Sequence, residues 1–187
     1  MRKLLAFLHV SADGYFAGPG GDLSWAKHEQ DPEYKAFADE NARRDSVLLF
    51  GRVTYQMMAG FWPSPMALER EPVMAVRMNE TPKIVFSRSL DDAAWNNTTL
   101  LKGDVVDEVR SLKQQNGADL VILGSSTIVK ALAQAGLIDE FQLLITPVVI
   151  GSGRTLFEGI PQRLDLDLTS SRAFKNGKVL LTYAPKL

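Results

Sequence analysis

Three short polar or glycine-rich clusters each follow an apolar run, and each has the composition of a phosphate-binding turn. The clusters are Gly51-Arg52-Val53-Thr54, Ser87-Arg88 and Gly124-Ser125-Ser126-Thr127. Open α/β sheets bind ligands beyond the carboxyl ends of their strands, and backbone N–H groups at the start of a helix favour anions. We therefore expect the three clusters to bind one nucleotide at one edge of a sheet.

The two arginines of these clusters indicate which nucleotide is bound. Arg52 and Arg88 carry planar guanidinium groups that match the geometry of phosphate oxygens. Neither position offers the acidic residue that reads a free ribose 2′-hydroxyl, so the clusters predict NADPH rather than NADH. Each arginine alone could form a surface ion pair, and serine caps many helices that bind nothing. The prediction therefore depends on the clusters lying together.

The composition limits the partners and the site chemistry. The chain has 187 residues, 45% of them hydrophobic, and we expect one domain over residues 1–187. Its 21 basic and 22 acidic residues give a formal charge of −1, which provides no overall attraction for nucleic acid or an anionic membrane. The absence of cysteine and the presence of two histidines argue against a metal site and suit the cytoplasm. No apolar run approaches the roughly 20 residues of a membrane helix.

Alternating strand and helix patterns predict an α/β fold. We expect strands at residues 4–10, 47–50, 84–86 and 120–123, and helices within residues 31–44, 51–58, 68–78, 104–117 and 124–136. Asp31 and Asp104 are expected to cap their helices, and Gly136 is expected to end the last one. Residues 11–21 are rich in turn formers and are expected to form a long mobile loop.

The C-terminal third shows a different pattern. Residues 141–146 and 164–168 alternate apolar with polar side chains, which is typical of half-buried strands. Asn176-Gly177 is a strong hairpin signal. The pattern therefore predicts a mixed sheet that is parallel at its centre and antiparallel at its C-terminal edge.

Several of these segments resemble the dihydrofolate reductase superfamily. The resemblance rests on residues 11–17, 50–55, 85–88 and 124–157, which follow one another in the expected order. More narrowly, they are similar to the C-terminal reductase domain of the bifunctional riboflavin deaminase-reductase and to its stand-alone bacterial relatives. This resemblance implies a three-layer α/β/α fold, a mixed and mainly parallel eight-stranded sheet with an antiparallel C-terminal edge, and commonly a homodimer.

The resemblance also implies an activity and a role for each cluster. It implies an NADPH-dependent reductase that transfers hydride to a small heterocyclic or ribosylamino-pyrimidine substrate. The cluster 51–54 would lie along the phosphate and ribose of the cofactor. Ser87 and Arg88 would bind the 2′-phosphate, and the cluster 124–127 would bind the pyrophosphate.

Two acidic residues are the candidate catalytic groups. Asp13 could hydrogen-bond the substrate or relay a proton, although an Asp-Gly pair is also an ordinary turn. Dihydrofolate reductases carry an acidic residue on the helix after the first loop, and Asp31 and Glu33 lie in that region. Riboflavin-pathway reductases typically have a lysine where this chain has Phe7. The alternatives are a dihydrofolate or pterin reductase and, from another class, an NADPH-binding regulatory or scaffold protein without turnover.

Aromatic side chains give a further indication of a pocket. Trp25, Phe61 and Trp62 could line an aromatic substrate pocket or pack in the core. His9 lies in an apolar strand, and we expect it in the core or in a pocket wall rather than as a catalytic acid.

Overall fold

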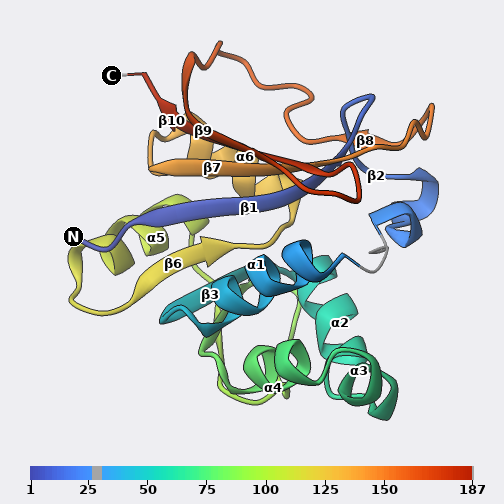
Figure 1. The fold of residues 1–187 in the computed structure, drawn as a ribbon. Helices are drawn as coiled ribbons and strands as arrows, with labels where there is room; N and C mark the ends of the chain where they lie inside the picture. Colours follow the sequence, from blue (N-terminus) through green and yellow to red (C-terminus); the bar gives the residue numbers. More distant parts are fainter. Residues whose placement is uncertain (27–30, 187) are drawn as a thin grey trace.

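A central sheet with helices on both of its faces forms the core of the protein (Figure 1). The structure is a computed structural model and describes residues 1–26 and 31–186. Its strands are β1 (Leu4–Ser11), β2 (Tyr15–Ala17), β3 (Ser46–Gly51), β4 (Lys83–Phe86), β5 (Thr98–Leu101), β6 (Asp119–Ile122), β7 (Glu140–Thr146), β8 (Arg154–Thr155), β9 (Leu166–Ala173) and β10 (Val179–Pro185). Its helices are α1 (Pro32–Arg43), α2 (Arg52–Phe61), α3 (Pro65–Arg70), α4 (Pro72–Glu80), α5 (Val105–Gln114) and α6 (Ser126–Gln134), with short 3₁₀ turns at Pro19–Gly21 and Ser24–Ala26.

The sheet has eight strands in the order β5-β4-β3-β6-β1-β7-β10-β9. The strands from β5 to β7 pair in parallel, whereas β10 pairs antiparallel with β7 and with β9. The predicted mixed sheet with an antiparallel C-terminal edge is therefore confirmed. A separate two-stranded sheet joins β2 to β8.

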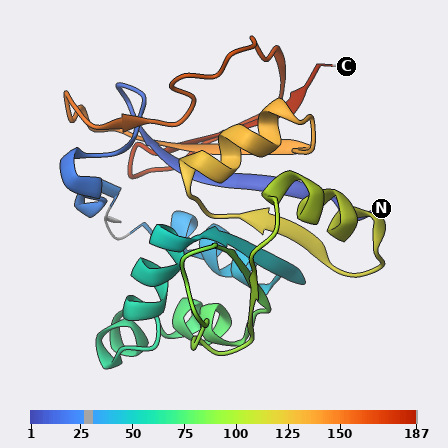
Figure 2. The same ribbon diagram turned by 180° about the vertical axis from the view of Figure 1, so that it is seen from behind.

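The two faces of the sheet have separate apolar cores, because side chains alternate between the faces along each strand. Leu4, Ala6 and Leu8 of β1 pack with α5 and α6, which cover one face (Figure 2). The opposite face carries two clusters. One surrounds Tyr34 of α1 and includes Phe7 at its fringe, and the other surrounds Phe50 beneath α2 and α4.

The predicted helix caps are confirmed. The Asp104 carboxylate accepts hydrogen bonds from the Val106 and Asp107 amides at the start of α5. The Asp31 carboxylate accepts from the Glu33 and Tyr34 amides at the start of α1. Both side chains satisfy N–H groups that have no partner within the helix.

Three expectations differ from the structure. Residues 68–78 do not form one helix, because Pro72 keeps Glu71 out of the helical conformation and separates α3 from α4. Residues 164–168 are not half-buried, since β9 is the outermost strand and Leu168 is 56% exposed. The segment 11–21 contains β2 and a 3₁₀ turn rather than only a loop.

The predicted hairpin between β9 and β10 is confirmed, with a turn that covers residues 174–178. Gly177 has a φ of +82°, a conformation that favours glycine. The Asn176 amide in this turn donates to Asp31 Oδ2 at 3.0 Å. Asp31 therefore caps α1 and also connects it to the C-terminal hairpin.

Replacing the two caps separately tests this double role. The Asp104→Ala variant is expected to lose about 1 kcal/mol of unfolding free energy, the usual effect of removing an N-cap. The Asp31→Ala variant is expected to lose more, because the hairpin contact disappears with the cap. Urea denaturation followed by circular dichroism measures both values, and equal losses would show that the hairpin contact contributes nothing.

Candidate functional site

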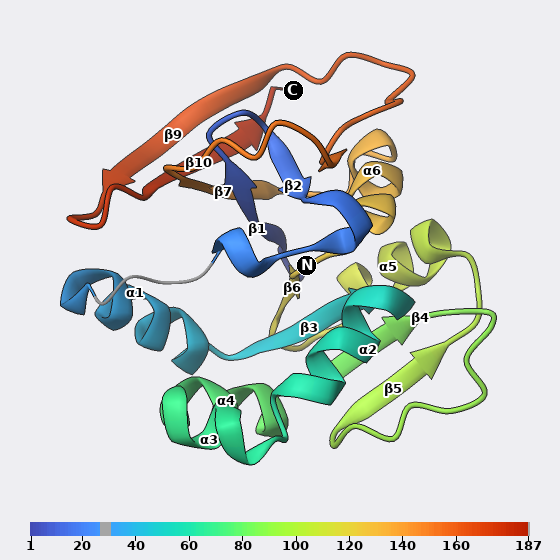
Figure 3. The same ribbon diagram turned by 90° about the vertical axis from the view of Figure 1, so that its right-hand side faces the viewer.

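The three clusters predicted to bind phosphate lie at one edge of the sheet. They follow β3, β4 and β6, which are adjacent and parallel, so their carboxyl ends share that edge. Figure 3 shows α2 leaving the end of β3 at this edge. The Gly51 amide donates to the Gly124 carbonyl oxygen at 3.3 Å, which joins two of the clusters directly.

Two helices begin side by side here without a side-chain cap. Gly51 occupies the N-cap position of α2 and Ser125 that of α6, and neither side chain accepts a hydrogen bond from its helix. Side chains cap α1, α3 and α5, whereas α4, like α2 and α6, has no side-chain cap. The first N–H groups of a helix lack intrahelical acceptors and lie at the positive end of its dipole. The starts of α2 and α6 therefore have the chemistry of an anion-binding site.

Glycine permits the close approach of these two helix starts. A Cβ atom on Gly51 would lie 2.6 Å from Ser125 Oγ. A Cβ atom on Gly124, whose φ is +124°, would lie 3.2 Å from both Thr54 Oγ1 and a Phe16 ring carbon. The peptide bond between Gly124 and Ser125 is cis. A side chain at either glycine would therefore occupy space between the clusters.

The two predicted arginines lie on the solvent side of this edge. Arg52 is exposed and donates from Nη1 to Gln56 Oε1 at 3.1 Å, one turn along α2. Arg88 is exposed as well. The neighbouring Ser87 hydroxyl accepts from the Leu90 amide at 3.1 Å and so shapes the turn after β4. Both guanidinium groups are accessible to an anion at the strand ends.

A cleft of about 900 Å³ adjoins these clusters, over the face of the sheet that carries α1, α2 and α4. This volume is within the range of small-molecule sites, roughly 300–1,000 Å³. The predicted cofactor residues that line it are Val53, Thr54, Ser125 and Thr127. The cleft therefore opens directly beside the uncapped starts of α2 and α6.

The two apolar clusters of this face form the walls of the cleft. Its floor includes Phe7 and His9 of β1. One wall comes from α1 and includes Tyr34, and the opposite wall includes Met58 and Trp62. Because the cluster beneath α1 and the cluster beneath α2 and α4 do not merge, a gap remains between them.

The predicted catalytic residue Asp13 lies outside the residues that line the cleft. Its carboxylate accepts from the Ser11 hydroxyl at 2.6 Å, the Gly151 amide at 2.8 Å and the Ile150 amide at 3.1 Å. The Ser11 hydroxyl bond, with help from the two amides, lowers the pKa of Asp13 against the opposing effect of burial. Asp13 thus connects the loop after β1 to the loop after β7.

The second predicted catalytic residue, Glu33, also lies outside the cleft lining. Its carboxylate accepts from Arg172 of β9 at 3.0 Å. Asp31 does line the cleft, but its carboxylate serves as the cap of α1 and as the hairpin contact. The structure therefore gives each carboxylate a structural partner, and the catalytic roles of Asp13 and Glu33 stay predictions.

Several residues of the cleft were not predicted from the sequence. Phe16, Leu23 and Arg154 reach it through the segment around β2 and β8, whose pairing depends on residues far apart in the chain. Of the residues that the sequence did suggest for a pocket, Trp62 and His9 line the cleft, whereas Trp25 and Phe61 do not. Met57 and Met58 lie in the helix predicted within residues 51–58, but a predicted helix does not by itself show which of its residues line a cleft.

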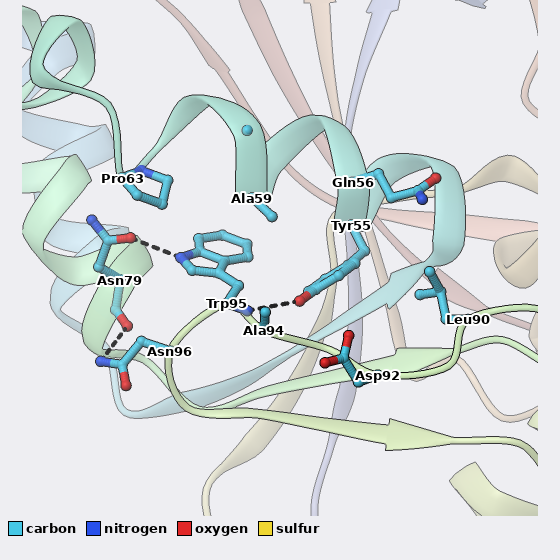
Figure 4. A pocket seen from close by; sticks show the side chains of 11 residues that line it. Tyr55, Gln56, Ala59, Pro63, Asn79, Leu90, Asp92, Ala94, Trp95 and Asn96 are labelled. Atoms are coloured by element: carbon cyan, nitrogen blue, oxygen red, sulfur yellow. Dashed lines mark hydrogen bonds between the residues drawn. The ribbon is translucent and has the colours of Figure 1, made fainter.

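A second, more open pocket of about 690 Å³ lies on the other side of α2 (Figure 4). Its floor is Trp95, whose backbone amide donates to the Tyr55 hydroxyl at 3.0 Å and whose indole donates to Asn79 Oδ1 at 2.7 Å. None of the predicted site residues lines it. These contacts hold Trp95 in place, near the end of the connection from β4 to β5 that begins with Ser87 and Arg88.

The contacts of Asp13 predict a pH effect on the two loops that it joins. The lowered pKa means that the ionised carboxylate stabilises the fold above its ordinary value of 3.8 and that this contribution is lost as the pH falls through the lowered pKa. The Gly151 amide proton signal in NMR is expected to titrate below pH 3.8, and Asp13→Asn is expected to abolish this titration. The Gly136 amide, which donates within the end of α6, serves as the internal control. A Gly151 signal that does not respond to pH would contradict the contact.

Over residues 1–26 and 31–186, no helix has both the length and the apolar character needed to cross a membrane.

Two proteins of Bacillus subtilis (strain 168), both uncharacterized, are similar to the chain in sequence. YyaP is 28% identical over 97% of this chain and 94% of its own length. YwjB is 26% identical over 92% of each chain.

Solved structures share the fold. A proposed riboflavin biosynthesis protein from Shewanella sp. PV-4 matches with a TM-score of 0.77 and 24% identity over 99% of each chain. The dihydrofolate reductase of Enterococcus faecalis, solved with NADP(H), matches with a TM-score of 0.65 and 19% identity over 99% of this chain and 97% of that chain. The bifunctional deaminase and 5-amino-6-(5-phosphoribosylamino)uracil reductase of Thermotoga maritima matches with a TM-score of 0.66 and 16% identity over 99% of this chain and 57% of that chain. The family model of the RibD C-terminal domain matches residues 2–180, and the chain therefore belongs to this family.

Proposed function

We propose that the protein is an NADPH-dependent reductase that transfers hydride to a small heterocyclic or ribosylamino-pyrimidine substrate. The observation that carries the proposal is the pair of uncapped helix starts, α2 and α6, at the mouth of the large cleft. Anion-binding groups beside a pocket suit a ligand with a phosphorylated end and a reactive ring. The family and the dihydrofolate-reductase-like fold agree with this activity.

The residues at the sheet edge fit the parts of a dinucleotide. The N–H groups at the starts of α2 and α6 suit its pyrophosphate, and the space kept open at Gly51 and Gly124 suits the close approach of a backbone to phosphate. Arg88, with Ser87, is proposed to bind the 2′-phosphate. Arg52 is proposed to bind a phosphate at the start of α2.

The reaction requires positioning more than acid or base side chains. NADPH supplies the hydride when it is bound, so the chain needs neither a nucleophile nor a metal for this step. The cleft walls hold the substrate ring beside the dinucleotide site and exclude water from it. Asp13 keeps the loop after β1 against the loop after β7, which fixes the neighbouring mouth residue Phe16.

One observation favours a second candidate function, a dinucleotide-binding protein without turnover. Both predicted catalytic carboxylates, Asp13 and Glu33, have structural partners and lie outside the cleft lining. Calorimetry with NADPH combined with an NADPH oxidation assay separates the two candidates. Binding with oxidation of NADPH by a pterin, a carbonyl compound or an aminopyrimidine supports the reductase. Binding without oxidation across these substrates supports the second candidate, and absence of binding overturns both.

Removing the Arg88 guanidinium tests the choice of cofactor. The Arg88→Ala variant is expected to bind NADPH more weakly by about 1.5–3 kcal/mol, the typical contribution of a charge-assisted hydrogen bond. NADH lacks the 2′-phosphate, so its affinity is expected to stay the same. Calorimetry with both dinucleotides measures the difference, and Arg110→Ala on α5 is the control for loss of one exposed arginine. Equal losses for NADPH and NADH would reject the proposed role.

A methyl group at Gly51 tests the space between the two helix starts. In Gly51→Ala the new Cβ would lie 2.6 Å from Ser125 Oγ, so the serine must move and NADPH affinity is expected to fall. Adding Ser125→Ala removes the hydroxyl oxygen and is expected to restore part of the affinity. Circular dichroism verifies that both variants fold. Unchanged affinity in Gly51→Ala would show that the dinucleotide does not use this space.

A further inference from the structure

The residues that line the cleft indicate which class of substrate it binds, and the proposed cofactor residues do not. Its floor is formed by side chains of the central strands, including Leu5 and Phe7 of β1, Leu48 of β3, and Val121 of β6. The polar floor residue Gln142 already donates to Glu140 Oε1 at 2.6 Å. Among the described residues, the floor therefore offers a mainly aromatic and aliphatic surface to a ligand, with His9 as a further polar side chain.

The wall formed by α2 and α4 carries four methionines. Met57 and Met58 of α2 and Met74 and Met78 of α4 line the same side of the cleft. Methionine side chains are flexible and polarisable, and they adjust to aromatic ligands of different outline. Met57 is 40% exposed, so part of this apolar surface contacts water unless a ligand covers it.

Two cations that line the cleft, Lys35 and Arg77, are engaged with protein groups. Lys35 pairs with Asp39 at 3.3 Å and lies 3.9 Å from Glu71. Arg77 donates from Nε to the Ala42 carbonyl oxygen at 2.9 Å, at the end of α1. These interactions reduce the charge that the cleft presents to a ligand.

The remaining cations of the lining do not belong to the strands that form the floor. Arg44 pairs with Glu40 at 3.8 Å. Arg70 and Arg154 are exposed residues on α3 and β8. A charged group held against the floor would lose its hydration without gaining an opposite charge there, which is costly.

We infer that the preferred substrate is an uncharged, planar, conjugated ring compound that carries neither phosphate nor carboxylate. The ring lies against Phe7 on the floor and between Tyr34 and the methionines of the walls. This inference names the substrate class of the proposed reductase and rests on that function for the reduction step. Binding of the ring depends only on the cleft.

The reduction of such a ring balances without another reagent. A hydride adds to the carbon of a conjugated C=N or C=O bond, and one proton from water adds to the heteroatom. The two electrons come from NADPH, which is oxidised to NADP⁺. Neither Asp13 nor Glu33 is required to touch the ring.

Two fluorescent probes with related fused rings test the inference on the full chain. Lumichrome is uncharged and planar, whereas riboflavin 5′-phosphate adds a phosphorylated side chain to a similar tricyclic ring. Fluorescence titration of each probe, with and without NADP⁺, is expected to show at least about tenfold tighter binding of lumichrome. Equal affinities, tighter binding of riboflavin 5′-phosphate, or no binding of lumichrome would overturn the inference.

A matched pair of variants places the binding in the cleft. Met57→Lys adds a cation to the cleft wall and is expected to reduce the preference for lumichrome over riboflavin 5′-phosphate at least about threefold. Met66→Lys adds the same charge to α3 at a residue that is 51% exposed and does not line the cleft, and it is expected to leave the preference unchanged. An equal effect of both variants, or no effect of Met57→Lys, would overturn the placement.

The same titrations separate failure of this inference from failure of the proposed function. NADPH affinity is measured on each sample by calorimetry. Normal NADPH binding with a preference for riboflavin 5′-phosphate overturns the substrate class and leaves the reductase standing. Absence of NADPH binding with tight lumichrome binding overturns the reductase and supports the uncharged ring as the ligand of the cleft.

Discussion

The parallel arrangement of β4, β3, β6 and β1 is the constraint on which the site depends. Parallel neighbours bring the segments that follow them to one edge, and the hydrogen bond from the Gly51 amide to the Gly124 carbonyl joins two of these segments there. The glycines allow α2 and α6 to begin close together, and the absence of side-chain caps leaves their first N–H groups directed toward that edge. The anion-binding chemistry thus follows from strand order and two small residues.

Much of the fold could be predicted from local patterns in the sequence. Continuous apolar runs marked the central strands, and Asp31 and Asp104 marked helix starts because carboxylates satisfy free N–H groups. The exposure of β9 could not be predicted, because it depends on the strand being the outermost of the sheet. Alternating apolar and polar residues indicate that a strand has a face able to pack, but the tertiary structure decides whether another element covers that face.

The part of the candidate site that could be predicted from the sequence consists of the residues that directly follow strands. The clusters after β3, β4 and β6 were expected to converge, and they do. The carboxylates were harder to interpret, since an Asp in a loop has the same sequence signature whether it meets a ligand or the backbone. Asp13 meets the backbone of residues 150 and 151, which are distant in the chain and were not indicated by any local signal. The apolar floor also needed the structure, because it combines residues from separate strands.

The position of β1 has a consequence for how the protein emerges from the ribosome. This strand precedes all others in the chain, yet its neighbours in the sheet are β6 and β7, which end at Ile122 and Thr146. Until the residues of β6 have been translated, β1 lacks both of the strands to which it hydrogen-bonds in the sheet. Pairing between strands that are far apart in the sequence slows folding relative to pairing between neighbouring strands. The sheet centre therefore cannot assemble before β6 and β7 have been synthesised, and the ligand cleft, whose floor includes β1, cannot form before then.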